Sequence, residues 1–85
     1  MKPKQVRLFV KSYCGWCHQA IDWLDEHRVS FETLDVGTDA AAFKEMLALS
    51  GQTKAPVIDV DGKILADFGA AELEGWLEKQ GFDTH

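Results

Sequence analysis

The sequence has few of the features that mark several large classes of protein. Its 85 residues include only two cysteines, two prolines and one tyrosine. No apolar run is long enough to span a membrane, and residues 1–5 lead into a strand-like segment without the apolar core of a signal peptide. A small secreted domain would ordinarily carry several disulfides. We therefore expect a cytoplasmic protein with no membrane partner, whose two cysteines serve redox chemistry or metal binding.

Positive charge is also scarce, because 9 Lys and Arg face 14 Asp and Glu, for a net charge of −5. This balance disfavours nucleic acid as a partner. The charge is uneven, since four basic residues precede the first acid, Asp22: Lys2, Lys4, Arg7 and Lys11. Lys2 and Lys4 are typical of a solvent-exposed N-terminal segment. Lys11, however, lies three residues before a cysteine and is expected to place positive charge beside it.

Apolar residues are plentiful enough for one compact core. They make up 46% of the chain, with five Phe and three Trp, against 27% charged residues. A chain of this length buries only about 60% of the surface that its unfolded form exposes, so the core must be compact. No repeat, linker or change of composition divides the sequence. We predict a single domain over residues 1–85, acting as a monomer.

Hydrophobic periodicity predicts the element order β-α-β-α-β-β-α. The expected elements are a strand over 6–10, a helix over 15–28, a strand over 30–36, a helix between Asp39 and Gly51, strands over 56–60 and 63–66, and a final helix opened by Gly69 with Glu72. Asp61-Gly62 is a strong hairpin signal between the last two strands. A helical crossover makes the first two strands parallel. The fold class is therefore α/β, with a four-stranded mixed sheet flanked by three helices.

The helices carry apolar faces that indicate which sides are buried. The expected buried residues are Cys17, Ala20, Ile21 and Leu24 in the first helix, Phe43, Met46, Leu47 and Ser50 in the second, and Leu73, Trp76 and Leu77 in the third. Residues 81–85 are expected to form a frayed tail.

Two cysteines, Cys14 and Cys17, lie where the first strand ends and the first helix begins. A cysteine there faces unpaired backbone N–H groups and the positive end of the helix dipole. These features favour the thiolate, which is the nucleophile, and Lys11 acts in the same direction. Cys14 is the expected attacking sulfur. Cys17, on the apolar stripe one turn later, is expected to be less exposed and to keep its proton.

This difference predicts a two-step reaction. Cys14 attacks a disulfide and forms a mixed disulfide, and Cys17 then attacks the Cys14 sulfur and releases the reduced substrate. The second step gains from proximity because it is intramolecular. Two inert buried cysteines would be the simplest alternative.

The chain resembles the glutaredoxins over nearly its full length. The family's lysine, two further residues and Cys-Pro-Tyr-Cys appear here as Lys11-Ser12-Tyr13-Cys14-Gly15-Trp16-Cys17. The family's Thr-Val-Pro, whose proline is cis, corresponds to Lys54-Ala55-Pro56, and its Gly-Gly with a following acid to the region of Ala66-Asp67-Phe68. The resemblance implies a thioredoxin-like fold. It also implies a glutathione-dependent thiol–disulfide oxidoreductase that reduces protein disulfides and glutathione mixed disulfides.

A glutathione groove follows from the same resemblance. Lys11 would meet a glutathione carboxylate, Trp16 would wall the groove, and the backbone of Ala55 would pair with the cysteinyl part as an added strand does. The implied substrate-binding residues are Lys11, Tyr13, Trp16, Lys54, Ala55, Pro56, Asp67 and Phe68. Without the resemblance, Pro56 would be read as a trans proline that opens an edge strand.

Three departures from the family pattern keep an alternative open. Gly15 replaces a proline and restores a backbone N–H near the sulfur. Lys54 replaces a threonine, as a second contact for a carboxylate. Asp67 stands where a glycine would let glutathione approach closely, and its carboxylate could attract the γ-glutamyl ammonium or repel the tripeptide. The alternative is a protein like the glutaredoxin-like electron donors of ribonucleotide reductase, which take electrons from thioredoxin reductase.

A metal site and a haem attachment site are alternative interpretations of the motif. His18 completes a Cys-x-x-Cys-His string, which also fits c-type haem attachment, but that group requires export and a largely helical protein. Zinc needs about four ligands, and His18, His27 and His85 match no common spacing. A 2Fe–2S cluster shared between two protomers and glutathione remains an alternative, because some glutaredoxins with a small residue after the first cysteine hold one.

Overall fold

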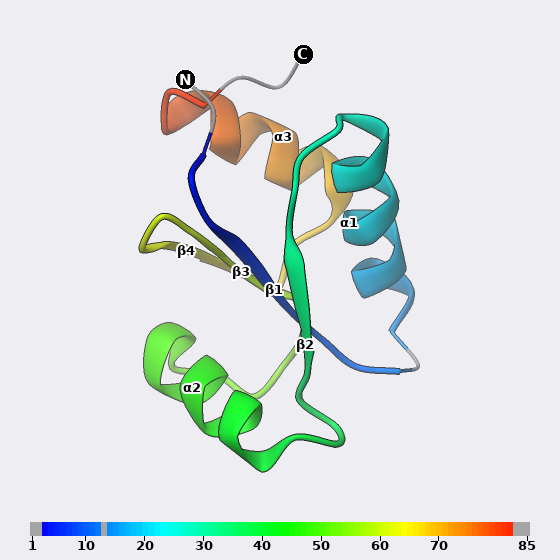
Figure 1. The fold of residues 1–85 in the computed structure, drawn as a ribbon, viewed down its shortest axis with the longest axis vertical. Helices are drawn as coiled ribbons and strands as arrows, with labels where there is room; N and C mark the ends of the chain where they lie inside the picture. The colour runs from blue at the N-terminus through cyan, green and yellow to red at the C-terminus, as the bar shows by residue number, and fades with distance from the viewer. Residues whose placement is uncertain (1–2, 13, 83–85) are drawn as a thin grey trace.

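The computed structural model describes residues 3–12 and 14–82. Seven elements follow in the predicted order (Figure 1). They are β1 (Val6–Val10), α1 (Gly15–Glu26), β2 (Glu32–Asp35), α2 (Ala40–Ser50), β3 (Val57–Val60), β4 (Lys63–Ala66) and α3 (Ala70–Lys79). The predicted fold class is confirmed.

The four strands form one mixed sheet in the order β2-β1-β3-β4. β1 pairs in parallel with β2, with Leu8 opposite Thr33, and antiparallel with β3, with Leu8 opposite Ile58. β3 and β4 form the expected hairpin. Its turn residues, Asp61 and Gly62, both have positive φ, of 52° and 90°, as a two-residue turn that matches the twist of the strands requires.

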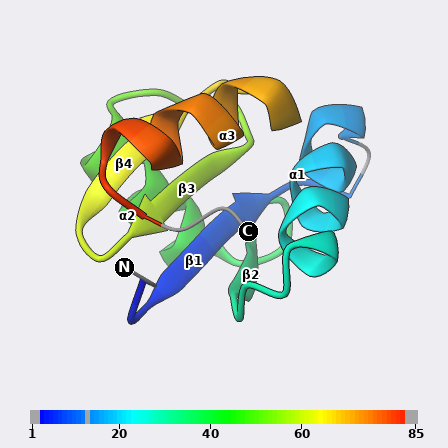
Figure 2. The ribbon, with the colours of Figure 1, turned by 90° about the horizontal axis from the view of Figure 1, so that it is seen from above.

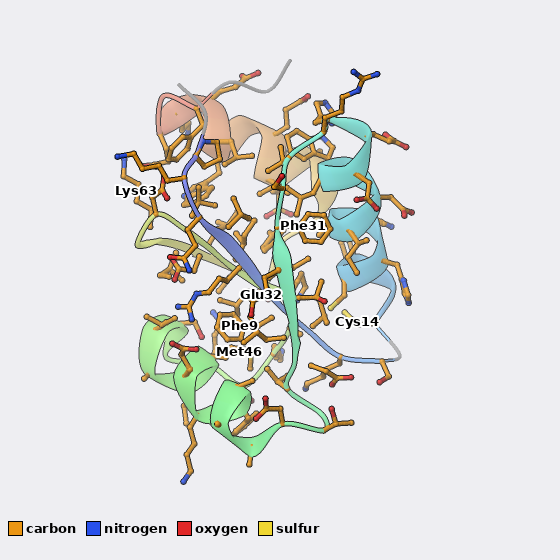
Figure 3. All side chains as sticks on the ribbon, in the orientation of Figure 1. Phe9, Cys14, Phe31, Glu32, Met46 and Lys63 are labelled. Carbon is orange, nitrogen blue, oxygen red and sulfur yellow. The ribbon has the colours of Figure 1, made fainter. Side chains whose placement is uncertain are left out.

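The helices cover both faces of the sheet. α1 and α3 lie on one face, and α2 lies on the other (Figure 1); Figure 2, which looks down on α1 and α3, shows α2 beyond the sheet. Because side chains alternate along a strand, Leu8 points into the core under α1 and α3, whereas Phe9 meets Met46 of α2 (Figure 3). The sheet therefore separates two apolar clusters.

An ion-pair network ties the sheet to α2. The Arg7 guanidinium of β1 donates to the carboxylate of Asp59 in β3 at 2.7 Å and to that of Glu45 in α2 at 2.8 Å. These hydrogen bonds, that to Asp59 first, raise the pKa of Arg7. Asp59 is buried and also accepts the backbone N–H of Gly62 at 2.8 Å. The network thus compensates a buried charge beside the hairpin.

Helix ends follow the expected capping chemistry, with small shifts. The side chain of Asp39 accepts from the backbone N–H groups of the first turn of α2, and Gly51 closes the helix with a φ of 73°, as predicted. α1 ends at Glu26, two residues earlier than expected, because Arg28 turns the chain with a φ of 56°. β2 is also shorter than predicted.

The prediction of a frayed tail is wrong for residues 81 and 82, and residues 83–85 lie outside the described residues. Gly81, with a φ of 84°, turns the chain back. The backbone N–H of Gly81 then bonds to Glu78 and that of Phe82 to Leu77, each at 3.0 Å. This is the paired C-terminal capping motif, which brings an apolar residue back onto the last turn. Phe82 is accordingly 5% exposed and joins the core.

The predicted burial is wrong for Leu47 and only partly right for Ile21, Phe43, Ser50 and Trp76, which are half-buried. Leu47 is 41% exposed, because α2 packs through Ala42 and Met46. Trp76 is only half-buried and lies against the cluster formed by Leu73 and Leu77. No helix in the described part of the chain is both long enough and apolar enough to cross a membrane.

Candidate active site

Cys14 occupies the N-cap of α1, at the end of the molecule where β1 runs into the helix (Figure 3). Its sulfur accepts a hydrogen bond from the backbone N–H of Cys17 at 3.2 Å and lies 3.9 Å from the carbonyl oxygen of Ala55. The side chain is half-buried. A backbone donor and the positive end of the helix dipole therefore face this sulfur, while its other side remains open to a substrate.

Cys17 lies one turn further along and is 1% exposed. Burial, and next its hydrogen bond with Cys14, raise the pKa of the Cys17 thiol from 9.0 to about 12. A backbone hydrogen bond from Lys11 and the Lys11 charge oppose this rise. Cys17 is therefore a protonated thiol at neutral pH, and both cysteines are free in this structure.

A cis proline stands directly across from the cysteines. The Ala55–Pro56 peptide bond is cis, as the family resemblance implied, so the alternative of a trans proline is wrong. The carbonyl oxygen of Ala55, which belongs to this peptide group, lies 3.9 Å from the Cys14 sulfur. The next carbonyl, that of Pro56, accepts the backbone N–H of Asp67 at 3.0 Å. This hydrogen bond connects the loop before α3, which contains Asp67, to the segment that faces the Cys14 sulfur.

That loop and α1 enclose a hollow of about 190 Å³ lined by Trp16, Asp67, Phe68 and Glu72. Trp16 is 57% exposed, as expected of a surface aromatic. Asp67 is exposed and has a φ of 54°, a conformation that favours glycine. Phe68 is 2% exposed, so its ring can offer a substrate only the floor of the hollow.

The other predicted site residues are distributed around the same end of the molecule. Lys11 and Lys54 are exposed. Lys11 is close enough to Cys17 for its charge to act on that thiol, and Lys54 directly precedes Ala55. Tyr13 lies outside the described residues. The structure thus brings together residues from three separate stretches of the chain.

Sequence reasoning missed two residues of this site, Gly69 and Glu72. Both were interpreted only as the opening of the last helix. A Cβ atom on Gly69 would lie 2.5 Å from the six-membered ring of Trp16, so the absence of a side chain makes room for the indole. Since the two residues are 53 positions apart, only the folded chain shows this contact.

The described residues, 3–12 and 14–82, contain no group of three or more His, Cys, Asp or Glu side chains that could hold a metal ion. His18 is exposed. The dithiol itself is therefore the chemically reactive feature of this region.

Comparison with known proteins agrees with this geometry. Residues 6–65 match the Glutaredoxin family. The chain is 33% identical to Glutaredoxin 3 of Escherichia coli K12, over 86% of this chain and 92% of that protein. It is 31% identical to a glutaredoxin-like 8.6 kDa protein in the rubredoxin operon of Clostridium pasteurianum, over 87% of this chain and 99% of that one.

Among solved structures, the thioredoxin-like protein BC3987 superimposes with a TM-score of 0.77 at 25% identity, over 84% of this chain and 97% of that one. The fold is therefore thioredoxin-like. The structural comparison and the family match over residues 6–65 thus agree. The chain belongs to the glutaredoxin family of thiol–disulfide oxidoreductases.

Proposed function

We propose that this protein is a cytoplasmic dithiol glutaredoxin, which uses glutathione to reduce protein disulfides and glutathione mixed disulfides. The observation that carries the proposal is the asymmetry of the two thiols. Cys14 is partly exposed to solvent and accepts a backbone hydrogen bond at the N-terminus of α1, whereas Cys17 is buried and its pKa is raised to about 12. A nucleophile and a protonated second thiol are thus held one turn apart.

The reaction proceeds in two exchanges. The Cys14 thiolate attacks one sulfur of a substrate disulfide, whose S–S bond breaks as the Cys14 mixed disulfide forms, and the departing sulfur takes a proton from water. Cys17 then loses its proton and attacks the Cys14 sulfur. The second substrate sulfur leaves and takes up a proton. Two electrons have then passed to the substrate, and a Cys14–Cys17 disulfide remains, which two molecules of glutathione reduce.

The surroundings of the dithiol support a peptide-like substrate. The carbonyl of Ala55 faces the reacting sulfur, so an extended substrate segment can pair with this backbone as an added strand. Lys11, three residues before Cys14, and Lys54, directly before Ala55, are both exposed, and we assign them to the carboxylates of glutathione. The open part of Trp16 walls the groove.

Comparison of electron donors tests the proposal. The oxidised protein is offered glutathione with glutathione reductase, or thioredoxin reductase alone, and NADPH consumption is followed with a glutathionylated peptide as substrate. Glutathione should sustain turnover. If glutathione is inert and thioredoxin reductase reduces the protein directly, glutathione is not its reductant.

One observation supports thioredoxin reductase as the electron donor. Asp67 and Glu72 place two carboxylates in the hollow beside the active site, and like charge there disfavours the α-carboxylate of a γ-glutamyl group. A donor fed by thioredoxin reductase, acting on protein disulfides, would have no such conflict. The donor comparison therefore separates the two functions directly.

Binding of a 2Fe–2S cluster fits this chain less well. Such a cluster needs four ligands, and only Cys14 offers a sulfur that is open to the surface, because Cys17 is buried. One chain cannot hold the cluster, so a second copy and glutathione would have to supply the other ligands. We expect the purified protein to be a colourless monomer, and visible absorbance with a dimeric elution volume would contradict this.

A further inference from the structure

The hollow lined by Trp16, Asp67, Phe68 and Glu72 belongs to the proposed substrate groove, and the exchange between sulfurs does not itself require its two carboxylates. Two contacts relate it to the reacting sulfur. The Cys14 sulfur lies 3.9 Å from the Ala55 carbonyl, and the neighbouring Pro56 carbonyl accepts the N–H of Asp67 at 3.0 Å. A substrate segment paired with Ala55 would therefore bring a side chain next to its cysteine over this hollow.

Trp16 gives the hollow an aromatic wall that is held in place. The six-membered ring of the indole lies against the backbone of Gly69, where a Cβ would meet it at 2.5 Å and 2.8 Å. The indole is nevertheless 57% exposed. Because the indole is held against Gly69 and the rest of its surface is exposed, it can contact a substrate with little loss of side-chain entropy.

The charged part of the lining is negative. Asp67 and Glu72 are both exposed, and neither carboxylate has a hydrogen bond or ion pair with another described residue. Glu72 lies in the first turn of α3, where the helix dipole accounts for an acid. Asp67 lies outside the helix with a φ of 54°, a left-handed conformation that aspartate adopts more readily than most residues with a side chain.

An aromatic platform with two carboxylates suits a cationic side chain, which gains cation–π attraction and ion pairing together. We propose that this hollow binds a lysine or arginine side chain next to the reactive cysteine of a protein substrate, with Gly69 as the residue that positions the Trp16 platform. This inference rests on the proposed disulfide reduction by Cys14. It adds a preference among disulfide substrates that the dithiol alone does not supply.

Charge-matched peptides test the inference. Two disulfide-bridged peptides that differ only in a lysine or a glutamate next to the cysteine are reduced by the wild-type protein at low ionic strength. We expect kcat/KM to be about tenfold higher for the lysine peptide, and the ratio to fall as salt is added. Equal rates for the two peptides would overturn the inference and leave the proposed function intact. Failure to reduce either peptide would overturn the proposed function.

Charge reversal shows whether the hollow is the source of the preference. Glu72→Lys should lower the lysine-to-glutamate ratio of kcat/KM to about one or below. Asp22→Lys, on the exposed side of α1 and outside the hollow, makes the same change in net charge and should keep the wild-type ratio. An equal loss in both variants would show that the preference comes from overall charge, and would overturn the assignment of the hollow.

Gly69→Ala tests the platform separately. The added Cβ must displace the indole, so the KM of the lysine peptide should rise more than that of the glutamate peptide, with kcat retained for both. An unchanged KM for the lysine peptide, in a variant whose circular dichroism matches the wild type, would contradict the role given to Gly69. Adding Trp16→Phe to the Gly69→Ala variant should restore little of the lost affinity for the lysine peptide, because a phenyl ring is the weaker cation–π partner.

Discussion

The sulfur of Cys14 accepts a hydrogen bond from the backbone N–H of Cys17 at 3.2 Å. The residue proposed to complete the reaction thus holds the attacking sulfur through its main chain, while its own thiol is buried behind the helix mouth. The backbone N–H of Cys17 and its thiol can be studied separately, since a substitution of the side chain leaves the backbone donor in place. Single variants can therefore separate the roles of the two cysteines.

The first prediction concerns these variants. Cys14→Ser should lower the reduction of every disulfide substrate about a thousandfold or more, because the nucleophile is lost. Cys17→Ser should still remove glutathione from a glutathionylated peptide, where free glutathione can resolve the mixed disulfide, but should lose most reduction of protein disulfides. Coupled assays with both substrates provide the measurement. Equal inactivity of the two variants on the glutathionylated peptide would contradict the division of roles.

The second prediction concerns stability at alkaline pH. The pKa of the Cys17 thiol is raised from 9.0 to about 12 in the folded protein, chiefly by burial. The folded state therefore holds this proton more tightly than the unfolded state. Below pH 9 both states keep the proton and the contribution is fully present; it is lost as the pH rises from about 9 toward 12.

Urea unfolding of the wild type and Cys17→Ala at pH 8, 9 and 10 checks this sign. The difference in unfolding free energy between the two proteins should shrink as the pH rises, because only the wild type loses the contribution of this thiol. Comparison with the variant cancels the titration of groups that do not interact with Cys17. A difference that is constant or grows with pH would contradict a raised pKa at Cys17.

The third prediction tests the packing of the C-terminal turn. Phe82 is 5% exposed and lies in the cluster beneath α1 and α3, so Phe82→Ala should lower the unfolding free energy by about 3 kcal/mol. Leu47→Ala is the matched control, since Leu47 is 41% exposed and its truncation should cost about 0.5 kcal/mol or less. Similar losses from the two substitutions would show that Phe82 does not belong to the core.

The fourth prediction concerns the ion pair between Arg7 and Asp59. Arg7→Met should cost about 2–4 kcal/mol in unfolding free energy, because it leaves the buried Asp59 carboxylate without its cation. Adding Asp59→Asn should recover part of this loss, since the amide oxygen can still accept the N–H of Gly62 and carries no charge. A double variant whose loss equals the sum of the single losses would exclude the coupling.

The sequence predicts the fold well because local signals agree with one another. The strand at 6–10, the Asp39 cap and the Gly51 stop of α2, and the turn at Asp61-Gly62 all depend on neighbours in the chain. The cis bond before Pro56 is different, because only the family resemblance predicted it. Local preferences alone favoured the trans form.

What the sequence did not predict depends on contacts between distant residues. Phe82 appeared to lie in a polar tail, but the positive φ of Gly81 returns it to the core. Gly69 appeared to be a helix start, but its missing side chain accommodates Trp16. Hydrophobic periodicity shows which side of an element is apolar, and it does not show how far a neighbouring element extends over that side, as the exposure of Leu47 illustrates.

Residue-resolved alkylation compares the reactivity of the two thiols. The reduced protein is treated with a limiting amount of iodoacetamide at pH 7, and mass spectrometry of the digest locates the label. Because Cys14 is half-buried at the N-terminus of α1 and Cys17 is a buried, protonated thiol, we expect rapid labelling of Cys14, with Cys17 remaining unmodified until the protein is unfolded. Labelling of Cys17 first, or of both cysteines at the same slow rate, would contradict this expectation.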